Sequence, residues 1–63
     1  MELNAQNFND ARKKAGHNLP IASTIIKTSV STLMEFGHGK MPKSKIIQQS
    51  INKYINKYLK EKI

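Results

Sequence analysis

The sequence predicts a compact all-α domain with a long C-terminal helix, and three observations support this fold class. Apolar residues recur at three- and four-residue steps through most of the chain, which is the spacing of one helix face. Capping and helix-ending residues separate these stretches, and no stretch alternates with the period of a strand. With 63 residues and no cysteine, the chain can form one small core without disulfides. We therefore expect a single domain over 1–63 with four or five helices.

The first helix is predicted over about residues 5–15. Asn4 or Asn7 can accept a hydrogen bond from a free backbone amide at its start. Gly16 can end it, because glycine enters the left-handed conformation that closes many helices. The residues that recur on one face of this helix are Phe8, Ala11, Arg12 and Ala15.

The second helix is predicted over about residues 19–27. Asn18 can cap it, and Pro20 is tolerated in a first turn. Its isoleucines are more numerous than a single core stripe requires, so some of them either pack under the last helix or form a partner surface. The apolar residues of this helix are Ile21, Ala22, Ile25 and Ile26.

A tight turn at Lys27 and Thr28 leads into a third helix, which extends from about Ser29 to Phe36. Ser29 can cap this helix by accepting from the amide of Thr32, and the glycine-rich residues 37–39 end it. The inward face then carries Leu33 and Phe36. The outward face carries Ser31 and Glu35, flanked by Val30 and Met34.

From about Ser44 the chain is predicted to form one long amphipathic helix. The apolar stripe can cap the core, pair with a second copy, or lie on a membrane, and the first of these is the default. The stripe consists of Ile47, Ile51, Tyr54, Ile55 and Tyr58. The opposite, basic side consists of Lys53, Lys57 and Lys60.

The charge of the chain favours anionic partners. Eleven Lys and Arg residues against four Asp and Glu residues give a formal net charge of +7. Such a field attracts nucleic acid, an anionic membrane surface or an acidic protein. No apolar run approaches the ~18 residues of a spanning helix, and the polar N-terminus is unlike a signal peptide. We therefore expect a cytoplasmic protein without a membrane partner.

The stretch Thr28–Lys40 resembles the Cro/repressor-type (Xre-like) helix-turn-helix domains of phage and bacterial regulators. It has a serine cap, apolar residues at the family's spacing, an acidic residue and a closing Gly-Lys. The resemblance extends from about Phe8 to Tyr58, and its further matches are Phe8, Arg12, Gly16, Asn18, Ala22 with Ser23, and Pro42. It implies a lambda-repressor-like fold in which the third helix enters the DNA major groove.

The chain departs from the family pattern at three positions. Gly37 stands where the family often has a glutamate that pairs with the arginine at position 12. Leu19 replaces a glutamine that touches phosphates, and Lys27 replaces the usual glycine of the turn.

The resemblance and the outward face of the third helix together predict the DNA contacts. Valine can pack on a thymine methyl, serine can donate or accept, and glutamate can accept from a cytosine amino group. Lysines and capping residues position the protein on phosphates. The expected base contacts are Val30, Ser31, Thr32 and Glu35. The expected phosphate contacts are Asn18, Lys27, Ser29, Lys40 and Lys43. A solvated helix face is the alternative interpretation.

The sequence argues against an enzyme. The two histidines, His17 and His38, have no cysteine or carboxylate at metal-ligand spacing, and no nucleophile motif accompanies them. We therefore expect neither a metal nor a cofactor.

Two hypotheses of function follow. The first is a sequence-specific double-stranded DNA binder, a small phage, plasmid or bacterial repressor that occupies an operator. The alternative is a protein-binding module on the same fold, such as an antirepressor, an antitoxin-like protein or a phage inhibitor of a host factor. Residues expected to contact a second copy are Tyr54, Ile55, Tyr58 and Leu59. Residues expected to contact another protein are Leu19, Ile21 and Ile25.

Overall fold

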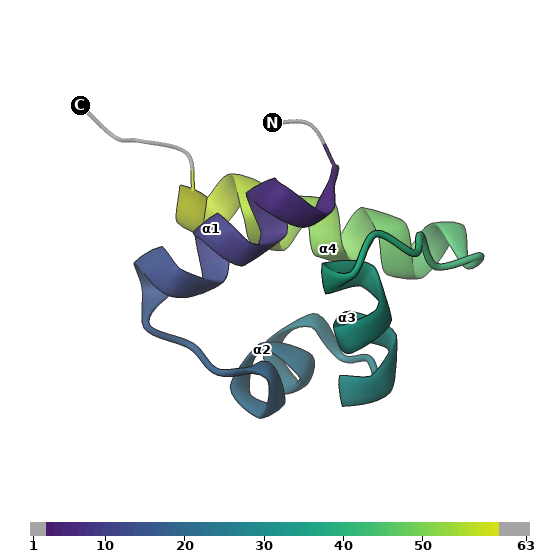
Figure 1. Ribbon diagram of the computed structural model, residues 1–63, viewed down its shortest axis with the longest axis horizontal. Helices are drawn as coiled ribbons and strands as arrows, with labels where there is room; N and C mark the ends of the chain where they lie inside the picture. Colours follow the sequence, from purple (N-terminus) through teal and green to yellow (C-terminus); the bar gives the residue numbers. More distant parts are fainter. Residues whose placement is uncertain (1–2, 60–63) are drawn as a thin grey trace.

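The computed structural model describes residues 3–59, which form four α-helices and no strand. The helices are α1 (Ala5–Ala15), α2 (Leu19–Ile26), α3 (Val30–Gly37) and α4 (Lys45–Leu59), shown in Figure 1. The predicted bounds are confirmed to within about one residue, because α2 ends just before Lys27 and α3 begins just after Ser29. No fifth helix occurs within the described range.

Side-chain caps fix where the first three helices begin. The Oδ1 atom of Asn4 accepts from the amide of Asn7 at 2.7 Å, and that of Asn18 accepts from Ile21 at 2.9 Å. The hydroxyl of Ser29 accepts from the amide of Thr32 at 3.1 Å. These bonds satisfy amides that have no partner within the helix, so the predicted caps are confirmed.

Helices α1 and α2 end at residues with left-handed backbone, whereas the C-cap of α3, His38, has φ −96° and is followed by a glycine with positive φ. Gly16 after α1 has φ +75°, and Gly39 after α3 has φ +101°. Lys27 has φ +70° at the end of α2, although its side chain disfavours that conformation. The two glycines adopt this backbone without strain, whereas Lys27 holds it at a cost.

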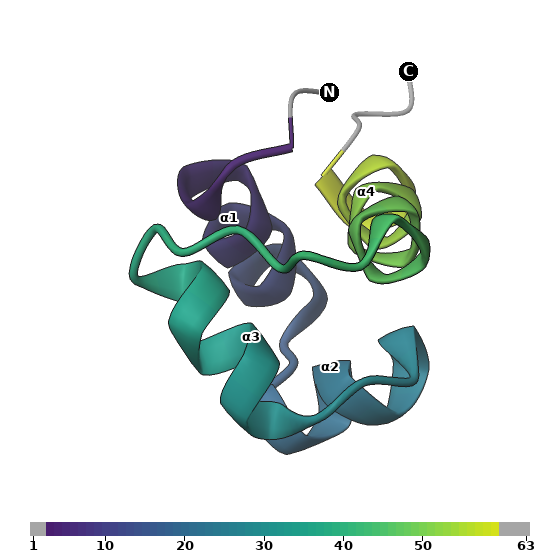
Figure 2. The same cartoon turned by 90° about the vertical axis from the view of Figure 1, so that its right-hand side faces the viewer.

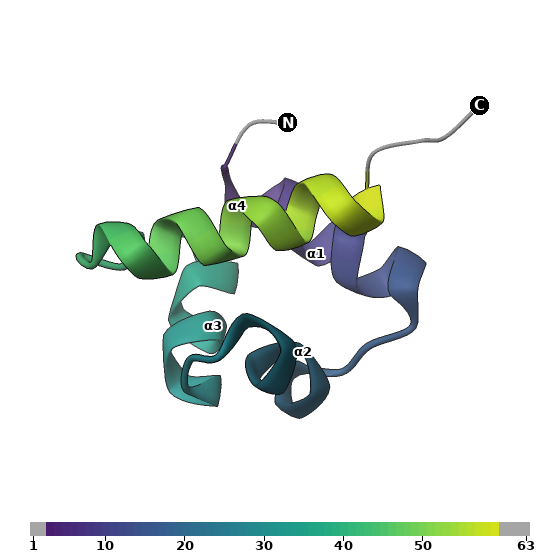
Figure 3. The same ribbon diagram turned by 180° about the vertical axis from the view of Figure 1, so that it is seen from behind.

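The four helices form a ring when the molecule is viewed end-on. In Figure 2, α1 and α4 lie side by side above α3 and α2, and each helix contacts its two neighbours around the ring. The most extensive of these interfaces joins α1 to α4, which crosses the whole domain in Figure 3. The long last helix therefore closes the fold by packing on the first.

The core lies inside this ring. The ring centroids of Phe8 and Phe36 are 5.6 Å apart in an edge-to-face arrangement, and Phe8 also lies 6.0 Å from Tyr54. The predicted inward face of α3 is confirmed, since Leu33 is fully buried and Phe36 is 1% exposed. The buried apolar residues are Phe8, Ala11, Ala22, Ile26, Leu33, Phe36, Ile51, Tyr54 and Ile55.

The apolar stripe of α4 caps this core, which corrects part of the expected contact with a second copy. Tyr54 is 2% exposed and Ile55 is fully buried, so neither offers a surface. The stripe is wide because α4 packs against both α1 and α2. Tyr58 and Leu59 are half-buried, and Lys60 of the predicted basic side lies outside the described residues.

A polar aromatic cluster joins the end of α1 to α4. Nδ1 of His17 lies 2.7 Å from the Tyr54 hydroxyl, and the ring of Tyr58 meets the His17 ring edge-on at 5.0 Å. Burial raises the pKa of the Tyr54 phenol above its ordinary value of 10.0, and nearby Tyr58 raises it further, while the Arg12 guanidinium opposes the rise. This cluster provides a hydrogen-bond partner for the buried Tyr54 hydroxyl.

Two isoleucines of α2 stay outside the core. Ile21 is 45% exposed and Ile25 is 41% exposed, so neither is buried under the last helix, and the alternative of a partner surface stays a prediction. Ile26 alone of the three isoleucines in α2 turns inward. Within the described part of the chain, no helix is long and apolar enough to cross a membrane.

Candidate nucleic-acid interface

The outward face of α3 carries small polar and acidic side chains. Because Leu33 and Phe36 point into the core, the 3.6-residue period turns Ser31 and Glu35 to solvent, and both are exposed. Val30 at the start of the helix is half-buried, and Met34 beside Ser31 is 49% exposed. The chain therefore presents one exposed hydroxyl and one exposed carboxylate on this face.

Thr32 is placed less favourably for a base contact than its neighbours. It is half-buried, and its hydroxyl lies 2.7 Å from that of Ser29, which also accepts from the Thr32 amide. This pair fixes the first turn of α3, and it occupies much of the hydrogen-bonding capacity of both hydroxyls. A phosphate could still receive the remaining hydroxyl proton.

The expected phosphate contacts lie on three exposed segments around α3. Asn18 caps α2 with its Oδ1 atom, so its amide group remains the donor for a phosphate. Lys27 is exposed in the connection between α2 and α3. Lys40 and Lys43 are exposed in the segment that follows α3. The amide of Lys40 donates to the Glu35 carbonyl at 2.9 Å, and this bond anchors the start of that segment.

Apolar side chains interrupt this basic and polar surface. Ile21 and Met34 are each more than two-fifths exposed, and Leu19 is half-buried at the start of α2. Isolated apolar side chains on a surface are ordinary, but several on two adjacent helices mark an area that can bury apolar surface. The face is therefore suited to thymine methyl groups or to a protein partner.

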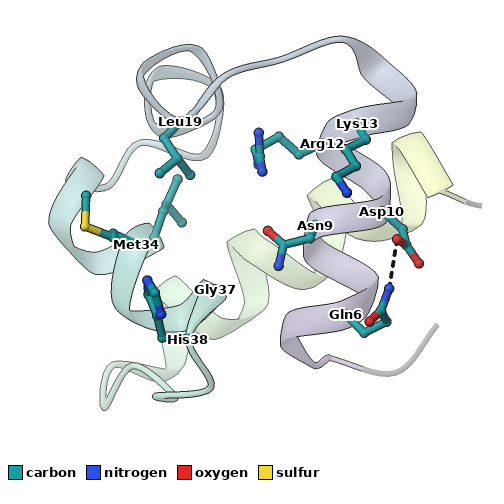
Figure 4. A pocket seen from close by; sticks show the side chains of 10 residues that line it. Gln6, Asn9, Asp10, Arg12, Lys13, Leu19, Met34, Gly37 and His38 are labelled. Carbon is teal, nitrogen blue, oxygen red and sulfur yellow. Dashed lines mark hydrogen bonds between the residues drawn. The ribbon is translucent and has the colours of Figure 1, made fainter.

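A groove of about 410 Å³ lies between α1 and α3, and Arg12 projects into it (Figure 4). Nη1 of Arg12 donates to the His17 carbonyl at 3.2 Å, which ties the arginine to the connection after α1. Its Nε atom is buried and has no hydrogen-bond partner. Across the groove, Gly37 provides no carboxylate, and a Cβ atom there would lie 3.7 Å from Oδ1 of Asn9.

The described residues contain no group of three or more histidine, cysteine or acidic side chains able to hold a metal ion. His17 is committed to Tyr54, and His38 is the exposed residue that follows α3.

Sequence reasoning missed the cluster formed by His17, Tyr54 and Tyr58. The sequence did place both tyrosines on one stripe of the last helix. Nothing in it indicated that a histidine 37 positions away would meet that stripe. The spacing of His17 directly after a helix-ending glycine was the only available signal.

Comparison with protein-family models, with curated proteins and with solved structures finds no match to this chain. The proposals below therefore depend on the residues and their geometry.

Proposed function

We propose that this chain binds double-stranded DNA in a sequence-specific manner through α3, as a small repressor that occupies an operator. The fold is then a lambda-repressor-like domain in which α2 and α3 are the helix-turn-helix and α3 enters the major groove. The observation that carries the proposal is the capped α3, whose exposed Ser31 and Glu35 are flanked by Lys27, Lys40 and Lys43.

The charge distribution supports the same proposal. Within residues 3–59 nine basic side chains accompany only Asp10 and Glu35 as acids. A phosphate backbone gains counterion-release free energy from such a surface whatever its sequence, while α3 supplies the contacts that depend on sequence. A dimer would bind half-sites about 34–36 Å apart. Of the predicted dimer contacts, Tyr58 and Leu59 are half-buried and keep some exposed surface.

Fluorescence anisotropy with a random duplex at about 50 and 200 mM salt tests the proposal. For three or four phosphate contacts, affinity should fall about 40- to 150-fold between the two concentrations. Selection from a random pool should then enrich one sequence. Absence of binding even at the lower salt concentration would contradict the proposal.

Two sets of variants separate positioning from sequence recognition. Lys40→Gln with Lys43→Gln should weaken binding to the random and the selected duplex alike. The slope of log affinity against log salt concentration should become less steep by about 2. The matched pair Lys53→Gln and Lys57→Gln on α4 should leave that slope nearly unchanged. Ser31→Ala should reduce preference for the selected sequence more than affinity for random DNA. An equal fall on both duplexes would show that Ser31 does not contact a base.

A protein-binding module is the second candidate, and the exposure of Ile21, Ile25 and Met34 favours it. In that case Ile21→Ser should abolish capture of the partner, and Ser31→Ala should not. DNA binding that is retained in full by Ile21→Ser would favour the repressor.

A further inference from the structure

A second groove, on the opposite side of the helix ring from Arg12, lies between α2 and α4. Its volume is about 230 Å³, and the positions of the two helices are seen in Figures 2 and 3. Ile25 and Tyr58 supply apolar surface to its lining, whereas Tyr54 adds almost none because it is 2% exposed. A groove of this size is smaller than the ~300–1,000 Å³ of typical small-molecule sites, so it suits one or two side chains of a larger partner.

Three lysines line the same groove. Lys27 contributes from the end of α2, while Lys53 and Lys57 contribute from successive turns of α4. The Nζ atom of Lys57 lies 5.3 Å from the centroid of the Tyr58 ring, which holds that charge at the edge of the apolar surface. No acidic side chain lines the groove among the described residues.

This combination limits what can occupy the groove. A second copy offers few carboxylates to these lysines, because Asp10 and Glu35 are the acidic side chains of its described residues. A DNA backbone would satisfy the lysines but offers no apolar group to cover Ile25 and the Tyr58 ring. An acidic segment with apolar side chains on one face satisfies both, because its carboxylates can meet the lysines while an apolar side chain enters between the helices.

We propose that the α2–α4 groove is a docking site for an acidic amphipathic helix of a partner protein. The site goes beyond the proposed DNA function, because it uses the side of α2 that faces α4 and leaves the outward face of α3 open. Lys27 borders both surfaces, so a chain that holds DNA and an acidic protein at the same time would share this one charge between them.

A blocked peptide of about 15 residues, with leucines on one helical face and glutamates elsewhere, is the probe. We expect it to bind with a Kd of about 0.1 mM and to shift the NMR signals of the Ile25 δ1 methyl and the Tyr58 ring. The signals of Ile21 and Met34 should move much less. Two control peptides, one with the same residues scrambled and one with serine in place of leucine, should bind at least tenfold more weakly.

Reciprocal charge reversals make the test specific. Lys53→Glu with Lys57→Glu should weaken binding of the acidic peptide about tenfold. The affinity for DNA should stay within about threefold of that of the parent chain. Lys40→Glu with Lys43→Glu gives the same net charge. This pair should weaken DNA binding about tenfold and leave the affinity for the acidic peptide within about threefold. Both pairs change exposed side chains, and circular dichroism verifies that they fold.

Four results would overturn the proposal. An equal loss of peptide affinity in both variant pairs would show that binding depends only on the net charge of the chain. Equal binding of the serine peptide would show that the apolar surface is not used. Shifts centred on Ile21 and Met34 would place the partner on the outward face. Competition by a random duplex for the Ile25 and Tyr58 signals would assign the groove to DNA.

Discussion

The α1–α4 layer and the α2–α3 layer both supply the core, but the isoleucines of α4 and of α2 differ in how far they are buried. In α4, Ile51 and Ile55 are fully buried and Tyr54 nearly so. In α2, Ile21 and Ile25 remain more than two-fifths exposed. Both layers supply the core, the first through Phe8, Ala11, Ile51, Tyr54 and Ile55 and the second through Ala22, Ile26, Leu33 and Phe36, but α2 also keeps two isoleucines outside it. Substitutions on the outward faces should therefore alter binding without unfolding the domain.

The largest expected effect comes from the core side of α4. Ile55→Ala should cost about 2–5 kcal/mol, which approaches the whole stability of a domain this small. Ile55→Val should cost about 0.5–1.5 kcal/mol and still fold. The matched change Ile21→Val on α2 should cost under about 0.5 kcal/mol. Urea denaturation followed by circular dichroism measures all three, and equal costs for the two valine variants would remove the contrast between the layers.

The next effect tests the bond that joins the end of α1 to α4. Tyr54→Phe removes the hydroxyl that lies 2.7 Å from Nδ1 of His17 and should cost about 0.5–1.5 kcal/mol. Tyr58→Phe is the control, because its ring rather than its hydroxyl meets His17, and it should cost less. Denaturation at neutral pH compares them, and a smaller loss for Tyr54→Phe would contradict the assignment.

The same tyrosine makes stability depend on alkaline pH. The pKa of Tyr54 is raised in the folded state. The stabilisation that its neutral hydroxyl gives the fold is therefore complete below a pH of about 10, the pKa of tyrosine in the unfolded chain. Between that value and the higher folded pKa, unfolding releases a proton, and stability falls as pH rises. Tyr54→Phe lacks this loss. Its stability deficit relative to the parent chain should therefore shrink above about pH 10, and a constant deficit would argue against the shift.

Two glycines should respond in opposite directions to the same substitution. Gly16→Ala should cost about 1 kcal/mol, because the backbone there has φ +75° although no atom lies within 4 Å of the added Cβ. Gly37→Ala should instead stabilise by about 0.5–1 kcal/mol, since this residue is helical and its Cβ would make ordinary contact with Asn9. Thermal denaturation measures both, and effects of the same sign would contradict the backbone assignment.

The smallest effect concerns the connection within the α2–α3 layer. Lys27→Gly should stabilise by about 0.5 kcal/mol, because relief of the left-handed backbone slightly exceeds the entropy that glycine adds to the unfolded chain. Lys27→Ala removes the same charge without that relief and serves as the control. Equal stability of the two variants in urea would show that Lys27 is not strained.

Helix positions were predictable from the sequence because the signals are local. Asn18 and Ser29 sit within four residues of the amides that they cap, and Gly16 ends its helix by its own backbone. The pairing of Leu33 with Phe36 also follows from one helical period. The proposed DNA face follows from the same period, and its role remains a prediction for the binding experiments.

Contacts between distant segments were not predictable in the same way. The stripe of α4 carried more apolar residues than one neighbour needs, and the sequence did not show that α4 meets both α1 and α2. Tyr54 and Ile55 were expected as contacts with a second copy, beside the default interpretation that the stripe caps the core, and both lie in the core. For Ile25 the sequence left open whether the last helix covers it or a partner does, and it lines an open groove beside that helix.

The pairing of α1 with α4 has a consequence in time. These two helices are the first and the last of the described elements, so their interface cannot form until α4 has left the ribosome. Until then Phe8 lacks the Tyr54 ring, and α1, α2 and α3 are each too short to persist alone. Synthesis should therefore yield a largely unstructured chain that folds in a single step when its last helix arrives.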